Sequence, residues 1–412
     1  MKKCSKLIFG IFLVVSVFIF AGCKDDKKDS DGKIVLTVWE SANGPDEFIK
    51  QAGAAFTAQN PNIEIKYEHV GVENAAGQLN FDGPAGLGPD LFAAPHDKLS
   101  ELIPNGLVLP VANPEKIKDL LLDVSIKGAT YNGTMYGYPV STETYALYYN
   151  KALISEDELP KTWEELAKWS KAFSEKNPGK FGFVVDVENP YYTIGFVSGK
   201  GNRLFGENGD DLSSSYLNTP EAIEGMEIFQ SLRKSCIDCP SGDLSDGVVD
   251  SLFASGSVAM HMSGPWYLEY FANAGIDYGI VPLPSMPGEP TPSASFSTVT
   301  CMFVSAYSEH PEEAAAFAEF LLSEEMQLLR YKLTGGSLPS IPTNIKDEFA
   351  VPFLEQLKYA YPMPVIDEMT RFWDVFSSAA SNIWNGADVK TELDAANATI
   401  IKKYYKGIDL HF

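Results

Sequence analysis

The sequence predicts an α/β protein, and the clearest indication is the order of three segments at its start. Residues 33–40, "KIVLTVWE", are an almost continuous apolar run, which is typical of a strand covered on both faces. Residues 45–61 then place Phe48 and Phe56 on one helical face and end at a proline. Residues 62–70, "NIEIKYEHV", alternate as a strand does. Strand, helix and strand at this spacing form a βαβ unit, which implies a parallel sheet with a right-handed crossover.

The same kind of pattern continues along the chain. It predicts strands over 89–95, 135–153 and 277–284, and helices over 162–173, 219–235 and 310–329. At the start of the first of these helices, Thr162 and Glu165 have the spacing of a capping box. Pro220 stands at the first helical position of the second.

Size and composition indicate a well-packed protein of two domains. The chain has 412 residues, of which 45% are hydrophobic, and a formal net charge of -23. The acidic residues are spread without long runs. Because binding phosphates needs a basic face, this balance excludes a nucleic-acid partner.

The first 32 residues have the features of an export signal and a tether. A basic start and an apolar run from Leu7 to Phe20 predict a signal peptide over 1–22, since the run is too short for a membrane span. The ending Ala21-Gly22-Cys23 resembles a bacterial lipobox, which implies that Cys23 is acylated and becomes the new N-terminus. Phe20 stands where leucine is usual, so plain secretion is the alternative. Residues 23–32 are charged and small, and we interpret them as a tether.

The remaining cysteines suggest structural roles. The spacing of Cys236 and Cys239 in "CIDC" favours a small disulfide in an oxidising compartment over a redox pair, because the surroundings lack a thioredoxin-like strand-to-helix entry. No further ligand for zinc is close in sequence. Cys301 lies in an apolar run and is expected in a core. The histidines are scattered singly, so we expect no metal and no cofactor.

Several segments, in order, resemble the maltose-binding-protein-like group of bacterial ABC-transporter solute-binding proteins over nearly all of the mature chain. The segments are "VWE", "GPDLFAAPHDKL", "YNGTMYGYPVSTETYALYYNKAL", "KTWEELAKWSKAF", "ENPYY", "SLFASGSVAMHMSGPW", "YGIVPLP" and "RFWDVFSSAA". The resemblance implies a two-lobed periplasmic-binding-protein fold, with hinged lobes and mixed, mainly parallel sheets. It also implies hinge closure on a solute that is then passed to membrane permease subunits. We therefore expect an exported monomer, periplasmic or on the cell surface and held to a bacterial membrane by its lipid, that is not an enzyme.

The resemblance also implies lobe boundaries. The N-terminal lobe would take residues 33–141 and 300–342, the C-terminal lobe 146–294 and 346–412, and the hinge crossings 142–145, 295–299 and 343–345.

Aromatic and acidic residues at matching positions imply an oligosaccharide site, with a maltodextrin-like ligand as the expected one. A sugar presents flat C–H patches, which suit aromatic rings, and hydroxyls, which suit carboxylates and amides. Trp266, Trp373 and Tyr191 match family positions for stacking rings, and core packing is the alternative for each. Glu143 and Asp97 match carboxylates that accept from sugar hydroxyls, and a solvated surface charge is their alternative.

The chain departs from the maltose binders mainly on the N-terminal lobe. Ala93-Ala94-Pro95 replaces the segment in which those proteins carry a tryptophan before the His-Asp pair, and Lys98 replaces an arginine. Their Asp-Lys pair after the first strand becomes "ESANGPDE", which leaves Glu40, Ser41 and Asn43 as polar candidates. Before "PYY" the carboxylate becomes Asn189, with Glu188 one place earlier. Sugar recognition on this lobe is therefore expected to be rebuilt.

Two other functions fit parts of the sequence. On the same fold the solute could be a polyamine, which acids and aromatics suit, or iron, since "YYNK" and "NPYY" contain paired tyrosines. A secreted glycosidase could instead use Glu143 and Asp97 as its two carboxylates. No nucleophile elbow or Ser-His-Asp order is present to favour a hydrolase.

Overall fold

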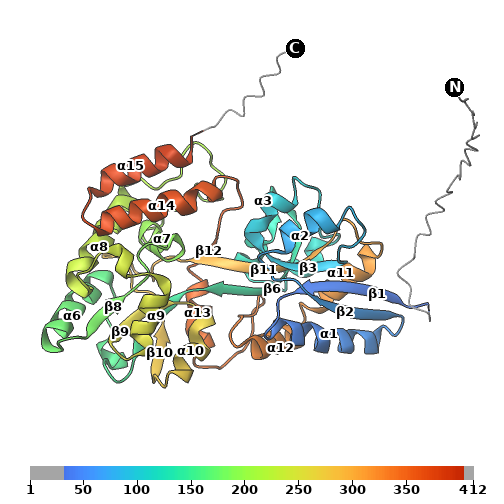
Figure 1. The fold of residues 1–412 in the computed structure, drawn as a ribbon, viewed down its shortest axis with the longest axis horizontal. Coiled ribbons are helices and arrows are strands. Elements are labelled where there is room, and N and C mark those ends of the chain that lie inside the picture. The colour runs from blue at the N-terminus through green and yellow to red at the C-terminus, as the bar shows by residue number, and fades with distance from the viewer. Residues whose placement is uncertain (1–31, 403–412) are drawn as a thin grey trace, which may run out of the picture.

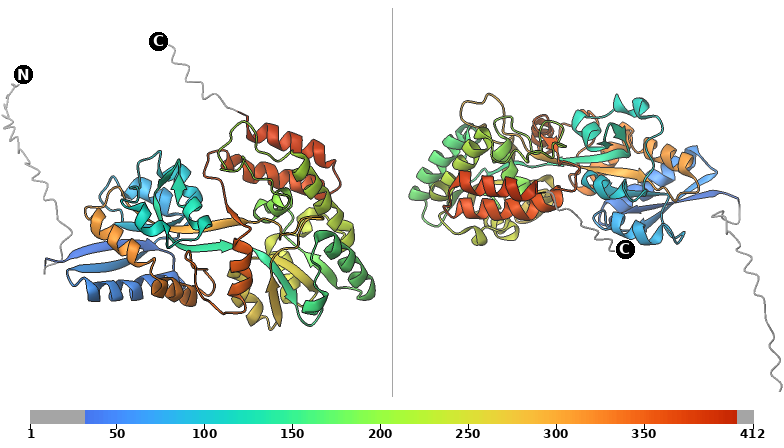
Figure 2. Two further views of the ribbon diagram at one scale, coloured as in Figure 1. Left: turned by 180° about the vertical axis from the view of Figure 1, so that it is seen from behind. Right: turned by 90° about the horizontal axis from the view of Figure 1, so that it is seen from above.

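The computed structural model describes residues 32–402, and these form two groups of elements that lie side by side (Figure 1). Both further views in Figure 2 keep the groups apart, with long strands running between them. Each group surrounds its own sheet and its own hydrophobic core. Among the described residues, no helix has the length and apolar character needed to cross a membrane.

The first sheet contains the predicted βαβ unit. Strand β1 (Ile34–Glu40) pairs in parallel with β2 (Ile63–His69), and the helix α1 (Pro45–Gln59) connects the two strands. Strand β1 also pairs in parallel with β3 (Leu91–Pro95). The sheet order is β12-β11-β3-β1-β2, and β6 pairs with β11. The other strands of this sheet are β6 (Gly137–Thr144), β11 (Phe296–Val304) and β12 (Tyr361–Pro362). Leu36 and Val38 of β1 are fully buried, which confirms the prediction of a covered strand.

Helices of the first group divide differently from the prediction at one place. The expected helix over 310–329 is two helices, α11 (Pro311–Phe320) and α12 (Glu324–Thr334). Ser323 lies between them in an extended conformation at the N-cap of α12, and Glu324 and Glu325 suit the positive first turn. The remaining elements of this group are α2 (Ala75–Asp82), η1 (His96–Lys98), α3 (Leu99–Leu102), α4 (Pro114–Lys118), α5 (Asp123–Gly128), β4 (Thr130–Tyr131) and β5 (Thr134–Met135).

The second sheet has the order β10-β7-β9-β8. Among the described strands of this sheet, only β8 and β9 pair in parallel, and the other two pairs are antiparallel. This sheet is therefore mixed but not mainly parallel, whereas mainly parallel sheets are predicted from the sequence. Its strands are β7 (Ala146–Asn150), β8 (Phe181–Val184), β9 (Val258–Ser263) and β10 (Tyr278–Val281). Its helical elements are η2 (Glu156–Glu158), α6 (Trp163–Lys176), α7 (Pro190–Ser198), α8 (Pro220–Cys236), η3 (Ser241–Asp243), α9 (Asp246–Ala254), η4 (Pro265–Tyr267), α10 (Leu268–Asn273), α13 (Ala350–Leu357), α14 (Met369–Trp384) and α15 (Val389–Ile400).

Strands β6 and β11 form an antiparallel ribbon between the two cores. Glu143 pairs with Thr298 in the register, and Thr142 pairs with Val299. Side chains alternate between faces along a strand, so Glu143 and Thr298 share one face and their neighbours share the other. The Oγ1 atom of Thr142 lies 2.8 Å from Ser125 Oγ on α5, which places α5 on that second face. Of the predicted hinge crossings, residues 142–144 and 296–299 fall on this ribbon, and residues 145 and 295 lie just beyond its strands. The lobe boundaries stay predictions.

The expected disulfide between Cys236 and Cys239 is absent from the structure, where both are free cysteines. Cys236 is the last residue of α8 and is buried, whereas Cys239 is half-buried. Burial raises the pKa of Cys236 to about 12. Cys301 is also buried, as predicted. Cys23 and the tether up to residue 31 lie outside the described residues.

The predicted capping box at α6 is confirmed, and it gives a stability prediction. Thr162 Oγ1 accepts from the Glu165 amide at 3.2 Å, and the Glu165 carboxylate accepts from the Thr162 amide at 3.2 Å. We expect Thr162→Ala to lower the free energy of unfolding by about 1 kcal/mol, because a first-turn amide loses its partner. Urea unfolding measures the change, and Thr162→Ser, which keeps the hydroxyl, should restore most of it.

Candidate ligand-binding site

Trp266 lies on a turn that the neighbouring residues fix. The Gly264 carbonyl accepts from the Tyr148 hydroxyl at 2.7 Å, and Pro265 begins the short helix η4. A Cβ atom at Gly264 would lie 2.1 Å from the indole of Trp266, so the ring folds over this glycine. Trp266 is still 45% exposed. Glycine here therefore allows a rigid aromatic ring to keep an open face.

Tyr191 lies beside Trp266, at the start of α7. The Asn189 side chain accepts from the Tyr191 amide at 3.0 Å and so caps the helix. The rings of Tyr191 and Trp266 have centroids 6.1 Å apart. Thr298 Oγ1 donates to the Tyr191 hydroxyl at 3.4 Å. Burial raises the pKa of Tyr191, and the Glu143 carboxylate adds to the effect, so the phenol stays neutral.

Glu143 is a half-buried acid on β6, next to Thr298 across the ribbon. Ser337 Oγ donates to its Oε1 atom at 3.1 Å. Burial raises the pKa of Glu143, while the Ser337 hydroxyl and the Arg330 charge act to lower it. Tyr191 thus contacts Trp266 and also Thr298, which lies next to Glu143 on the β6–β11 ribbon, and the ligand roles of these residues stay predictions.

Trp373 joins the same region through Phe296. The ring centroids of Trp373, on α14, and Phe296 are 6.2 Å apart. The ring centroids of Tyr191 and Phe296 are also 6.2 Å apart. Tyr361 packs edge-on against Phe296 at 5.1 Å, with the Arg203 guanidinium 4.8 Å from the Tyr361 ring. The three predicted rings are therefore linked by a buried phenylalanine that sequence reasoning did not single out.

Asp97 follows a histidine that ties three segments together. His96 Nδ1 accepts from the Val299 amide at 3.1 Å, so its hydrogen is on Nε2, which donates to the Met363 carbonyl at 3.1 Å. Burial lowers the pKa of His96, which keeps it neutral. Asp97 Oδ1 is buried and has no hydrogen-bond partner within residues 32–402. Such an atom is costly unless something else satisfies it.

The other residues predicted to bind ligand are Asn43, Glu188 and Asn189. Asn43 is exposed in the loop after β1, with φ 63°. Glu188 accepts from Ser381 Oγ of α14 at 3.1 Å. The Oδ1 atom of Asn189 is occupied by its capping bond. Their ligand roles stay predictions.

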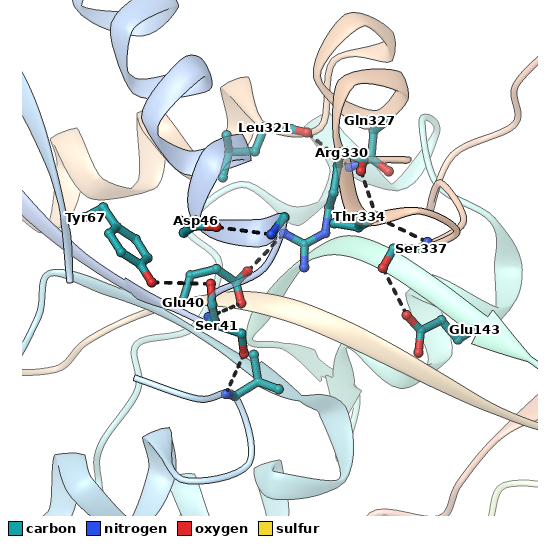
Figure 3. Close-up of polar contacts among 12 residues, drawn as sticks. Glu40, Ser41, Asp46, Tyr67, Glu143, Leu321, Gln327, Arg330, Thr334 and Ser337 are labelled. Atoms are coloured by element: carbon teal, nitrogen blue, oxygen red, sulfur yellow. Dashed lines mark hydrogen bonds and ion pairs between the residues drawn. The ribbon is translucent and has the colours of Figure 1, made fainter. Parts of the chain in front are cut away.

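The loop after β1 differs from the expectation that Glu40 and Ser41 are open candidates. Glu40 is fully buried, and its Oε2 atom accepts from Arg330 Nη1 at 2.9 Å (Figure 3). Ser41 Oγ accepts from the Val72 amide at 3.1 Å. The guanidinium of Arg330 also lies 5.3 Å from the Phe48 ring. This buried pair leaves Glu40 a structural acid.

Two cavities, of about 460 and 620 Å³, border Lys127 next to α5. The first is also lined by Arg203 and Tyr361, and the second by Val124 and Ile341. None of the residues predicted to bind ligand lines either of them. Both cavities border α5, which covers the face of the ribbon opposite Glu143.

Comparison with known proteins defines the class. Residues 51–350 match the family described as bacterial extracellular solute-binding protein. The galactooligosaccharide-binding protein of Bacillus subtilis (strain 168) is 35% identical over 97% of this chain and 96% of its own. A maltooligosaccharide ABC transporter solute-binding lipoprotein of Streptococcus pneumoniae (strain ATCC BAA-255 / R6) is 27% identical over 98% and 97%. The chain belongs to the bacterial extracellular solute-binding protein family.

A solved structure agrees in fold. The crystal structure of a cyclo/maltodextrin-binding protein complexed with maltotetraose has a TM-score of 0.83 and 31% identity, covering 92% of this chain and 100% of that one. The two-lobed α/β fold predicted from sequence is confirmed by this similarity.

Proposed function

We propose that this protein captures an oligosaccharide between its lobes and delivers it to the membrane permease of an ABC importer. The observation that carries the proposal is the exposed Trp266 beside Tyr191, whose hydroxyl accepts from Thr298, the neighbour of Glu143 on the β6–β11 ribbon. Rings suit the C–H faces of a sugar, and the carboxylate suits its hydroxyls. The family membership, and two relatives named for binding oligosaccharides, support the proposal.

The roles follow from the contacts. Trp266 and Trp373 stack on sugar rings, Tyr191 packs at a tilt against Trp266, and Glu143 accepts from hydroxyls through its second carboxylate oxygen. Asp97 brings an oxygen that has no partner among the described residues and so gains from a hydroxyl donor. Closure at 142–145, 295–299 and 343–345 brings the lobes onto the sugar.

The ligand is a short oligosaccharide, for which two linkage classes have support. A maltodextrin fits the stacking rings and the structural similarity to a maltodextrin binder. A galacto-oligosaccharide fits the more similar relative, which is 35% identical, and the altered N-terminal lobe. The protein binds the sugar without cleaving it.

The cellular setting belongs to the same proposal. The protein is exported, acylated at Cys23 and held as a monomer at the periplasmic or outer face of a bacterial membrane. One relative is itself named a lipoprotein, which supports the anchor. The permease receives the sugar when the lobes open.

We expect a ligand panel to settle the cargo. The mature protein is heated with maltotriose, maltotetraose, a β-galactotriose, spermidine and ferric citrate, and its unfolding is followed by fluorescence. A ligand at a hundred times its Kd should stabilise the folded state by about 2.7 kcal/mol. Stabilisation by spermidine or iron alone would contradict the proposal, and shortened sugar products would mean a glycosidase.

A further inference from the structure

The loop that follows α12, Gly335–Leu338, touches both parts of the candidate site. It begins where α12 ends, with Gly335 in the left-handed conformation as the C-cap. Thr334 Oγ1 accepts from the Ser337 amide at 3.3 Å and donates to the Arg330 carbonyl at 2.8 Å. The loop is therefore fastened to the last turn of the helix.

One end of the loop holds β6. Ser337 Oγ donates to Glu143 Oε1 at 3.1 Å, and the Leu338 carbonyl accepts from the Thr142 amide at 2.9 Å. Figure 3 shows Ser337 between the helix that carries Arg330 and the strand that carries Glu143. A bond from a neutral hydroxyl fixes one carboxylate oxygen and directs the other away from the loop. Ser337 thus orients the acid.

The middle of the loop meets the turn of Trp266. Gly336 is buried, with φ 146°. A Cβ atom there would lie 3.1 Å from the Pro265 carbonyl oxygen and 3.2 Å from Leu268 Cδ1. A side chain at Gly336 would therefore push against the residue that precedes Trp266, in addition to straining its own backbone.

We propose that Ser337 and Gly336 are positioning residues for sugar binding, which set the carboxylate of Glu143 and the indole of Trp266 in a fixed relation across the two lobes. The inference rests on the proposed function of the same site. It assigns a role in ligand affinity to a loop that sequence reasoning left without one.

The first test is the pair Ser337→Ala and Ser337→Thr, titrated calorimetrically with the tightest sugar of the panel. Alanine should weaken binding about tenfold, because the Glu143 carboxylate loses the hydroxyl that aligns it. Threonine keeps the hydroxyl and should restore most of the affinity. Equal affinity of Ser337→Ala and the unchanged protein would overturn the role of Ser337.

A pH series gives a readout that a purely structural role would not move. The groups that face Glu143 are Ser337, the Arg330 charge of α12 and the Tyr191 phenol of α7. Burial holds the pKa of Glu143 above its ordinary value, and the Ser337 hydroxyl lowers it. An ionised Glu143 accepts sugar hydroxyls, so affinity falls as the pH falls through that pKa. Without the hydroxyl the pKa rises further, and Ser337→Ala should lose affinity at a higher pH. If the affinities of Ser337→Ala and of the unchanged protein fall at the same pH, the proposal is contradicted.

Gly336→Ala tests the other half, with Gly386→Ala as the matched control. Gly386 also has a positive φ, 103°, but a Cβ there would meet nothing within 4 Å. Gly336→Ala should weaken sugar binding at least tenfold, whereas Gly386→Ala should bind as the unchanged protein does. Equal affinities for the two variants would overturn the coupling to Trp266. If the unchanged protein binds no sugar, the proposed function fails instead.

Discussion

Replacing Trp266 with alanine should weaken sugar binding about 30-fold while leaving the fold nearly as stable. Trp266 is 45% exposed in the structure, so the open face of its ring is covered only when a ligand lies on it. Covering such a face contributes about 2 kcal/mol to binding. Because about 1.4 kcal/mol corresponds to a tenfold change in affinity, the loss of this contribution corresponds to about 30-fold. Isothermal titration with the sugar measures the loss, and thermal unfolding without sugar measures stability.

Tyr270 supplies the control for this prediction. It is four residues further along and is also 45% exposed, but it contacts Tyr267 and Phe271 and not Tyr191. Tyr270→Ala should therefore keep its sugar affinity. If Trp266→Ala and Tyr270→Ala bind sugar equally well, exposure alone does not mark the site and the stacking role of Trp266 is wrong.

Replacing Arg330 with methionine should lower the free energy of unfolding by about 3–5 kcal/mol, because it leaves the carboxylate of Glu40 buried without its partner. Glu40 is fully buried and Arg330 is 3% exposed. Urea unfolding measures the loss. In the double variant Glu40→Leu, Arg330→Met, most of the stability should return, since no charge is then left in the core.

An exposed ion pair gives the contrast for Arg330. Lys390 and Asp394 are one turn apart on α15 and lie at the surface. Lys390→Met should leave the urea midpoint unchanged within error. A loss as large as that of Arg330→Met would mean that burial does not set the cost.

Sequence patterns predicted what short spacings determine. The βαβ unit, the capping box of α6 and the helix that opens at Pro220 each depend on residues within a few positions of one another, and each is present. The aromatic residues at the site came from resemblance to a family whose members place rings there. The "CIDC" spacing misled, because closeness in sequence does not make two thiols face each other: Cys236 ends a helix with its side chain in the core.

The contacts that shape the site could not be predicted in the same way. Ser337 and Glu143 are 194 positions apart, and Arg330 and Glu40 are 290 apart. No period or spacing connects residues at such separations, and only the chain crossing between lobes brings them together. Glu40 was for that reason a candidate ligand in the sequence and is a buried ion-pair partner in the fold.

The alternation of side chains along β6 separates the residue that faces the candidate site from the residues that bond to neighbouring segments. Thr142 and Thr144 point to one face, where their hydroxyls bond Ser125 and Ser295. Glu143, which lies between them in sequence, points to the other face. If Glu143 binds the sugar as proposed, its exchange for another residue would leave the hydroxyl bonds on the opposite face intact. An insertion or deletion of one residue in the strand would instead exchange the faces and lose both at once. New cargo on this scaffold should therefore arise by substitution within β6 and never by a change in its length.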